Sequence, residues 1–211
     1  SKFNRATQGG RLVGSGIKPL IYTAALESGM TPATQINDSP VVFDQTEGAT
    51  DWRPQNSGGT FLGPTRLRTA LYKSRNLVSV RLVRELGVSR IIDIADRFGL
   101  DTAKLPRDLS ISLGTASLTP LEMAETYAIF ANGGYRVQNH LIDRIESADG
   151  AILYQTRPVS VCRNSCEGRS VSVDLEFDNR LRPTQSDLFE LDYNDRIAPR
   201  VLDERIHFLI N

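Results

Sequence analysis

The sequence predicts an α+β fold in which helices predominate, on two observations. Between residues 15 and 131, most of the chain carries apolar residues at helical spacing, interrupted by Gly, Pro and Asn. From residue 135 to 156 the pattern changes to two β-like segments around the turn Ala148-Asp149-Gly150, which predicts an antiparallel hairpin. Helices followed by a separate antiparallel element are typical of the α+β class.

Helices are expected at six places, and a start or stop signal bounds each of them except the last. The clearest begins after Thr119, because Thr119 can cap it, Pro120 suits its first position and Glu122 lies three residues after the cap. The expected helices cover 15–28, 64–74, 75–87, 89–99, 119–131 and 201–210. Residues 46–63 are rich in Gly, Pro, Asn and Asp, which predicts a long ordered loop, and such loops are usually functional or disordered.

The composition excludes several classes of function. Lys plus Arg and Asp plus Glu each total 25 in 211 residues, so nothing favours binding to nucleic acid or to an acidic membrane surface. No stretch approaches the roughly 20 apolar residues of a membrane span. Cys162 and Cys166 lack the partners of a zinc site, and we expect them to be free or locally paired at the surface. We expect no metal and no cofactor.

Three segments are expected along the chain. Residues 1–157 form the first part of one domain, residues 158–197 a polar, acid-rich insertion or mobile loop, and residues 198–211 the start of a helix. The insertion is a solvated loop or a site for partners. The chain opens without methionine, and the final helix has no stop signal, so we expect a fragment of a longer polypeptide.

The first candidate site is Ser15-Gly16-Ile17-Lys18. Residues i and i+3 share a helix face, so the Lys18 side chain can reach the Ser15 hydroxyl. A lysine that is desolvated in a cleft can act as a general base near neutral pH. Gly14 and Gly16 allow a substrate to approach the backbone closely. The alternative is that Ser15 is a simple helix cap and Lys18 is solvated.

The second candidate site is Ser74-Arg75-Asn76, at the junction of two expected helices. A hydroxyl and a carboxamide two residues apart on a tight turn can point into one cleft, where the hydroxyl can relay protons and the amide can hold a substrate carbonyl. The alternative is that Ser74 or Asn76 caps the second helix.

These residues lie in segments that resemble a known family. KFNRATQ and RLVGSGIKPLIYTAALESGMTPAT resemble the start of the transpeptidase domain of class A penicillin-binding proteins. Two further segments, DWRPQNSGGTFLGPTRLRTALYKSRNLVSVRLVRELG and LSISLGTASLTPLEMAETYAIFANGGYR, follow in the same order. The resemblance covers roughly residues 2 to 156, and APRVLDERIHFLIN extends it. It is greatest to the bifunctional Gram-negative enzymes of the 1a type.

The resemblance implies a fold with an antiparallel sheet packed between helices and a helical subdomain on the other side of the cleft. It implies that Ser15 attacks the penultimate D-Ala carbonyl of a D-Ala-D-Ala stem peptide to form an acyl-enzyme. Lys18 would take the serine proton, Ser74 would pass a proton to the leaving amine, and Asn76 would hold Lys18 and the substrate amide. A neighbouring stem peptide would resolve the acyl-enzyme, and β-lactams would trap Ser15.

The family also has a Lys-Thr-Gly strand that edges the cleft. Only Lys2, Lys18, Lys73 and Lys104 occur here, and none begins such a motif. We therefore expect a second chain or segment to supply the rest of the domain. The resemblance also implies an N-terminal membrane anchor and a glycosyltransferase domain outside this chain, and a place on the periplasmic face of the bacterial inner membrane. We expect the isolated chain to be inactive, since losing one oxyanion donor typically costs about 10²–10³ in rate.

Two other functions are alternatives for the same fold. A serine β-lactamase would share both motifs but needs a group that activates water, and Glu85 and Glu122 both fall within expected helices. A non-catalytic receptor or scaffold domain would keep the fold and lose the cleft residues. Ser15, Lys18, Ser74 and Asn76 are all present, which favours the enzyme.

Overall fold

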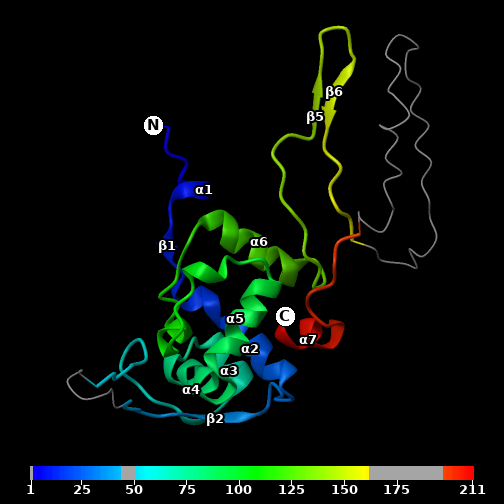
Figure 1. Ribbon diagram of the computed structural model, residues 1–211. Coiled ribbons are helices and arrows are strands. Elements are labelled where there is room, and N and C mark those ends of the chain that lie inside the picture. Colours follow the sequence, from blue (N-terminus) through cyan, green and yellow to red (C-terminus); the bar gives the residue numbers. More distant parts are fainter. Residues whose placement is uncertain (1, 44–50, 162–196) are drawn as a thin grey trace. The chain divides into compact units, whose positions relative to one another are not determined.

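A computed structural model describes residues 2–43, 51–161 and 197–211. The chain forms two compact units, Ser1–Gly134 with Val201–Asn211 and Tyr135–Arg200 (Figure 1). The first unit contains α1 (Arg5–Gln8), β1 (Arg11–Leu12), the 3₁₀ turn η1 (Gly14–Ile17), α2 (Lys18–Glu27), β2 (Gln35–Asp38), β3 (Gly63–Arg66), α3 (Leu67–Tyr72), α4 (Asn76–Leu86), α5 (Val88–Arg97), η2 (Thr102–Lys104), η3 (Leu109–Leu113), β4 (Ser117–Leu118), α6 (Pro120–Ala131) and α7 (Glu204–Ile210). The second contains β5 (Arg144–Glu146) and β6 (Ile152–Gln155).

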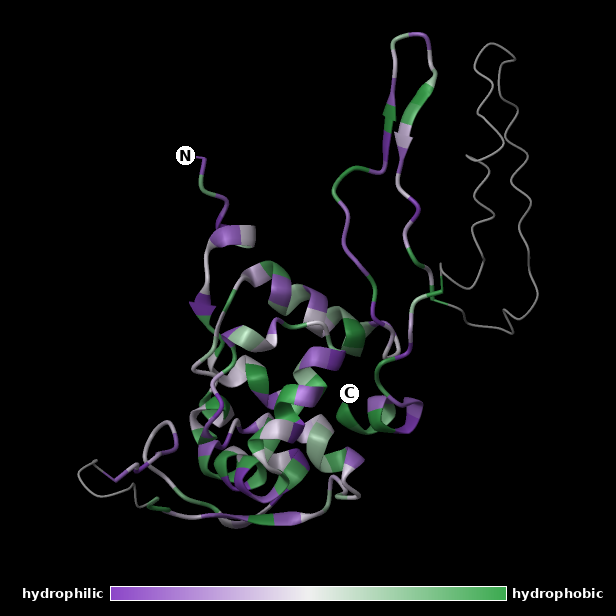
Figure 2. Cartoon of the chain, viewed as in Figure 1, coloured by the Kyte–Doolittle hydropathy of each residue, from purple (hydrophilic) through white to green (hydrophobic). Residues whose placement is uncertain are grey.

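Helix α2 is the centre of the first unit. Every residue from Leu20 to Leu26 is buried, and α3, α4, α5 and α7 all contact the helix. A helix that is apolar on all sides needs neighbours on all sides, whereas the surrounding helices carry both hydrophobic and hydrophilic residues (Figure 2). The helix ends at Glu27 with Ser28 as its C-cap, and Gly29 follows with a φ of +94°, a conformation that glycine adopts readily. The expected helix over 15–28 is therefore present, with η1 as its first turn.

The expected start of the next helix, at Pro64, is wrong. Pro64 lies in β3, which pairs antiparallel with β2, and α3 begins only at Leu67. Proline has no backbone N–H, so it is tolerated in the edge strand of this two-stranded sheet. The remaining helices lie close to their expected ranges, as α4, α5, α6 and α7.

The capping box of α6 is present as predicted. The Thr119 side chain accepts a hydrogen bond from the Glu122 N–H at 3.2 Å, and Glu122 Oε2 accepts one from the Thr119 N–H at 2.7 Å. Two N–H groups that the helix itself cannot satisfy are paired in this way.

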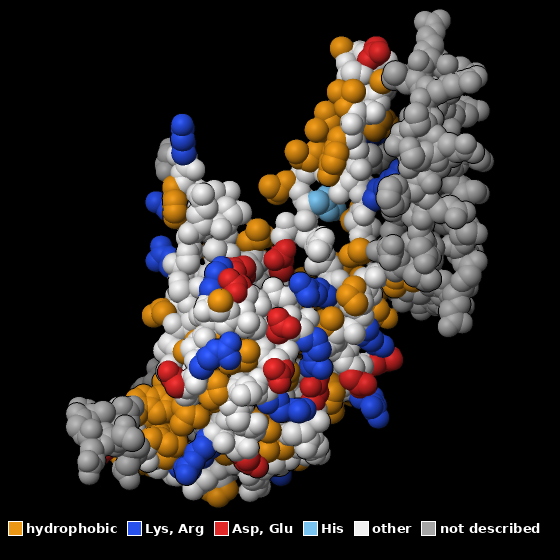
Figure 3. Space-filling view, viewed as in Figure 1, with side chains coloured by type: hydrophobic (Ala, Val, Ile, Leu, Met, Phe, Trp, Pro, Cys, Tyr) orange, Lys and Arg blue, Asp and Glu red, His pale blue; other side chains and the backbone are white. Residues whose placement is uncertain are grey.

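The expected hairpin forms in the second unit, with shorter strands than the pattern suggested. Strands β5 and β6 pair antiparallel with a bulge between Ile145 and Glu146. Ser147 and Ala151 close the turn with a hydrogen bond of 2.8 Å. Hydrophobic side chains gather on this hairpin (Figure 3), and Ile145, Ile152, Leu153 and Tyr154 are all exposed.

The fold class is confirmed: helices combine with small antiparallel sheets, of which the described residues form three, each two-stranded. Within the described part of the chain, no helix has the length and hydrophobicity needed to span a bilayer. The segment boundaries at 157 and 197 remain predictions, and Cys162 and Cys166 lie outside the described residues.

Candidate active site

The backbone before α2 presents Ser15 to solvent. Gly14 has a φ of +55°, and its N–H donates to the Gly114 carbonyl oxygen at 2.9 Å. A Cβ atom on Gly114 would lie 1.9 Å from the Gly14 carbonyl oxygen, so this close approach requires glycine at position 114. Ser15 follows in η1 and is exposed, whereas Lys18 is buried.

The junction between α3 and α4 brings the second motif to the same place. Ser74 has a φ of +53°, and it is the one non-glycine residue with positive φ in the described part of the chain. The left-handed conformation costs a side-chain-bearing residue about 1–2 kcal/mol. The turn is closed by the Arg75 N–H, which donates to the Ala70 carbonyl oxygen at 2.8 Å.

A continuous chain of hydrogen bonds joins the four predicted residues. Ser74 Oγ donates to Ser15 Oγ at 2.9 Å and accepts from Lys18 Nζ at 2.9 Å. Lys18 Nζ also donates to the Ser74 carbonyl oxygen at 2.7 Å and to Asn76 Oδ1 at 2.7 Å. The connection from Lys18 to Ser15 thus passes through the Ser74 hydroxyl, and neither serine acts as the simple helix cap considered above.

The environment of Lys18 favours the loss of its proton. Burial of the ammonium group, and to a smaller extent the positive charge of Arg75, lowers the pKa of Lys18 from 10.5 to about 8. Desolvation disfavours the charged form of a lysine, and a like charge acts in the same direction. A group with a pKa near the working pH is suited to acid–base catalysis.

The long loop expected over residues 46–63 contacts the candidate site. The carbonyl oxygen of Gln55 accepts a hydrogen bond from Asn76 Nδ2 at 2.9 Å. This contact orients the amide so that its oxygen faces Lys18. Tyr127, from α6, donates to the Gly16 carbonyl oxygen at 3.1 Å, next to Ser15 in the chain.

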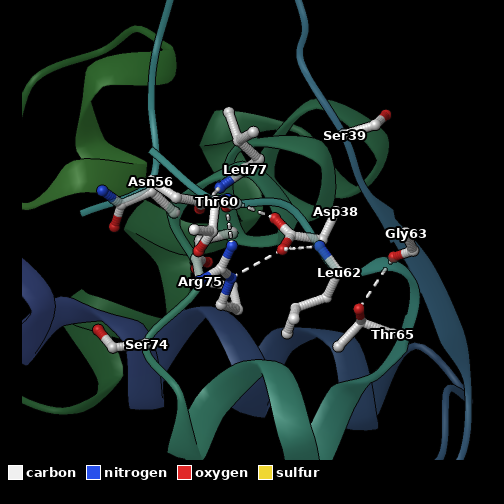
Figure 4. Close-up of polar contacts among 12 residues, drawn as sticks. Asp38, Ser39, Asn56, Thr60, Leu62, Gly63, Thr65, Ser74, Arg75 and Leu77 are labelled. Atoms are coloured by element: carbon white, nitrogen blue, oxygen red, sulfur yellow. Dashed lines mark hydrogen bonds and ion pairs between the residues drawn. The ribbon is translucent and has the colours of Figure 1, made fainter. Parts of the chain in front are cut away.

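Sequence reasoning missed a buried polar cluster behind the Ser74–Asn76 turn (Figure 4). Asp38 pairs with Arg75 at 2.7 Å and accepts a hydrogen bond from Asn56 at 2.7 Å. All three side chains are buried. The sequence contained one weak signal for this cluster: the charged residue Arg75 stands between Ser74 and Asn76, and a buried arginine needs a partner.

Among the described residues, no group of His, Cys, Asp and Glu is arranged to hold a metal ion.

Comparison with known proteins identifies the family. The profile described as "Penicillin binding protein transpeptidase domain" matches residues 2–168. The chain belongs to this family. Penicillin-binding protein 1A of Vibrio cholerae is 43% identical over 210 residues, which are 99% of this chain and 24% of that protein. Penicillin-binding protein 1A of Pseudomonas aeruginosa is 50% identical over 161 residues, 76% of this chain and 20% of that protein. The chain therefore spans about a quarter or less of the length of these relatives.

Solved structures agree with this assignment to the transpeptidase family. Penicillin-binding protein 1A from Haemophilus influenzae matches 100% of this chain and 30% of its own, with a TM-score of 0.80 and 37% identity. A penicillin G acyl-enzyme complex of penicillin-binding protein A from Mycobacterium tuberculosis matches 73% of this chain and 40% of its own, with a TM-score of 0.63 and 28% identity. The expected resemblance to penicillin-binding transpeptidases is confirmed.

Proposed function

We propose that this chain carries the nucleophile and the proton relay of a peptidoglycan D,D-transpeptidase. The observation that carries the proposal is the hydrogen-bond chain from buried Lys18 through Ser74 to exposed Ser15. It connects a nucleophile open to substrate with a base whose pKa is about 8.

In the first step, Ser15 Oγ attacks the carbonyl carbon of the penultimate D-Ala of a stem peptide. With Lys18 neutral, both hydrogen bonds reverse, so that Ser15 donates to Ser74 and Ser74 donates to Lys18; the Ser15 proton then moves to Ser74 Oγ as the Ser74 proton moves to Lys18 Nζ. The tetrahedral intermediate then collapses, the bond to the terminal D-Ala nitrogen breaks, and that nitrogen takes a proton back along the same relay. D-Ala leaves, and Ser15 holds the acyl group as an ester.

In the second step, an amine from a neighbouring stem peptide attacks the ester carbonyl, and its proton returns to Ser15 Oγ through Ser74 as the peptide cross-link forms. A β-lactam enters the same first step: Ser15 opens the lactam ring, and the ring nitrogen takes the proton. The nitrogen remains tethered to the acyl group, so no fragment departs. In this scheme Asn76 holds Lys18 and the substrate amide.

Acylation by a fluorescent penicillin tests the proposal in two proteins. One is the 211-residue chain, and the other is the Vibrio cholerae relative with this chain in place of its aligned segment. We expect the chimera to be labelled at Ser15, with Ser15→Ala abolishing the label, and the chain alone to remain unlabelled, as expected above for a chain without the Lys-Thr-Gly strand. Labelling of the chain alone would overturn that last expectation while supporting Ser15 as nucleophile. Absence of label in both proteins would overturn the proposal.

The place of the longer protein in the cell is also a proposal. We infer an enzyme on the periplasmic face of the bacterial inner membrane, anchored by a segment outside this chain and carrying a glycosyltransferase domain. The support is the similarity to proteins named penicillin-binding protein 1A along nearly the whole chain. Polymerisation of lipid-linked disaccharide by the protein encoded by the complete gene would test it, and a gene without a glycosyltransferase domain would contradict it.

A further inference from the structure

Asp38 is a fully buried carboxylate close to the site but not part of the proton relay. It lies at the end of β2 and has no exposed surface. Its Oδ2 atom accepts from Arg75 Nε at 2.7 Å and from the Leu62 N–H at 3.0 Å, and its Oδ1 atom accepts from Asn56 Nδ2 at 2.7 Å. A buried charge is tolerated only when it is paired and hydrogen-bonded in this way.

The partners of Asp38 hold both sides of the turn that contains Ser74. Arg75 directly follows Ser74, and it also donates to the Thr60 carbonyl oxygen. Asn56 Oδ1 accepts from the Leu77 N–H at 3.2 Å, in the first turn of α4. Figure 4 shows the Arg75 side chain and the Leu62 N–H bonded to the Asp38 carboxylate, with Asn56 and Leu77 nearby. The two ends of the Ser74–Asn76 segment are therefore connected to one buried group.

Ser74 needs such support because its backbone is in an unfavourable conformation. A non-glycine residue with a φ of +53° persists only where surrounding contacts determine it. The Ser74 side chain faces Lys18 and Ser15 and is exposed, so the packing that holds it must come from its neighbours. Arg75 is the buried neighbour, with a side chain only 9% exposed.

We propose that Asp38 is a positioning residue for acylation: through Arg75 and Asn56 it holds the strained Ser74 turn so that the Ser74 hydroxyl bridges Ser15 and Lys18. This inference rests on the proposed function. Asp38 touches none of the relay atoms itself. Its effect is to fix the distance between a hydroxyl on the α3–α4 turn and a nucleophile on η1, two segments that are far apart in sequence.

The test measures the rate of penicillin acylation of the chimera at a series of drug concentrations. This gives two separate quantities, the maximal rate and the half-saturating concentration. Asp38→Asn keeps the shape of the side chain and removes its charge. We expect the maximal rate to fall by about 10²-fold, because a misplacement of about 1 Å costs that much, while the half-saturating concentration stays unchanged. Arg75→Lys keeps the charge but cannot reproduce the Nε contact, and we expect it to lower the maximal rate as well.

Leu105→Ala is the matched control for stability. Leu105 belongs to the hydrophobic core and is 5% exposed, and it takes no part in the site. We expect this variant to melt at a lower temperature, as Asp38→Asn does, and to acylate at the rate of the unmodified chimera.

Each result decides the question. A normal maximal rate in Asp38→Asn, or in Arg75→Lys if Asp38→Asn does not fold, overturns the inference. If Leu105→Ala melts at the same temperature as Asp38→Asn and loses as much of the maximal acylation rate, the inference is also overturned, because instability would then explain the effect. If the unmodified chimera is not acylated at all, the proposed function fails instead.

Discussion

The Ser74 hydroxyl donates a hydrogen bond of 2.9 Å to the Ser15 hydroxyl, although 59 positions separate the two residues. The same hydroxyl accepts from Lys18. The Ser74 hydroxyl therefore links Lys18 to Ser15, and a variant without this hydroxyl tests whether the link matters for acylation.

Ser74→Ala is expected to slow acylation of the chimera by about 10²–10⁴-fold, the usual contribution of a positioned proton-transfer group. The nucleophile remains, so slow labelling at Ser15 should persist and be visible by intact mass. Equal rates in Ser74→Ala and the unmodified chimera would show that the proton takes another route.

Acylation should depend on pH through Lys18. The pKa of Lys18 is lowered to about 8, and in the proposed mechanism the neutral amine is the base, so the rate should rise with pH to a plateau above about 8. At pH 7, roughly a tenth of Lys18 is neutral. A rate profile that is flat from pH 6 to 9 would contradict the role of Lys18 as base.

The titration of Lys18 can also be followed without catalysis. The chain has four lysines, so ¹³C-labelled lysine gives few side-chain signals, and Lys18→Arg identifies the one from Lys18. Its midpoint should lie near 8. Because the unfolded chain holds this proton more tightly, the free energy of unfolding gains a contribution as pH rises from about 8 towards 10.5. A midpoint of 10 or above would contradict the burial argument.

Gly114→Ala should disrupt the segment before Ser15. Gly114 has a φ of +69°, and an added Cβ would meet the Gly14 carbonyl oxygen at 1.9 Å. Gly29→Ala is the matched control, since Gly29 has a φ of +94° with nothing within 4 Å of the added atom. In both variants the left-handed conformation of alanine costs about 1–2 kcal/mol. The free energy of unfolding, measured by chemical denaturation, should fall further in Gly114→Ala than in Gly29→Ala. Equal losses would mean that the close approach relaxes easily.

Thr119→Ala should lower the free energy of unfolding by about 0.5–2 kcal/mol, the usual effect of removing a helix cap. The variant loses the contact to the Glu122 N–H at 3.2 Å. Thr119→Ser keeps the capping oxygen and should stay close to the parent. Urea denaturation measures the stability of both variants. An unchanged midpoint in Thr119→Ala would show that the Glu122 side chain alone is enough to cap the helix.

Local patterns predicted much of the helical framework, because helix starts and stops depend on residues a few positions apart. The capping box at Thr119 and the stop at Gly29 are examples. Pro64 was assigned to a helix because its role in a strand depends on pairing with β2, which local spacing does not reveal. Ser15, Lys18, Ser74 and Asn76 were proposed from motif and resemblance, and the structure brings them into contact.

The buried cluster of Asp38, Arg75 and Asn56 could not be predicted from the sequence. Asp38 and Arg75 are 37 positions apart, and Asn56 lies 18 positions from Asp38. No periodicity connects residues on a strand, a loop and a helix junction. Their convergence depends on the tertiary packing of β2 and α4, so only the folded chain reveals it.

The three hydrogen bonds of Lys18 have a consequence for its two protonation states. An ammonium group has three hydrogens, and Ser74 O, Ser74 Oγ and Asn76 Oδ1 accept all of them. A neutral amine has two hydrogens and a lone pair that can accept from the Ser74 hydroxyl, the direction that the proposed relay requires. Burial therefore favours the neutral amine, whereas the three acceptors favour the ammonium ion, so the site stabilises both protonation states that the proposed proton transfer needs.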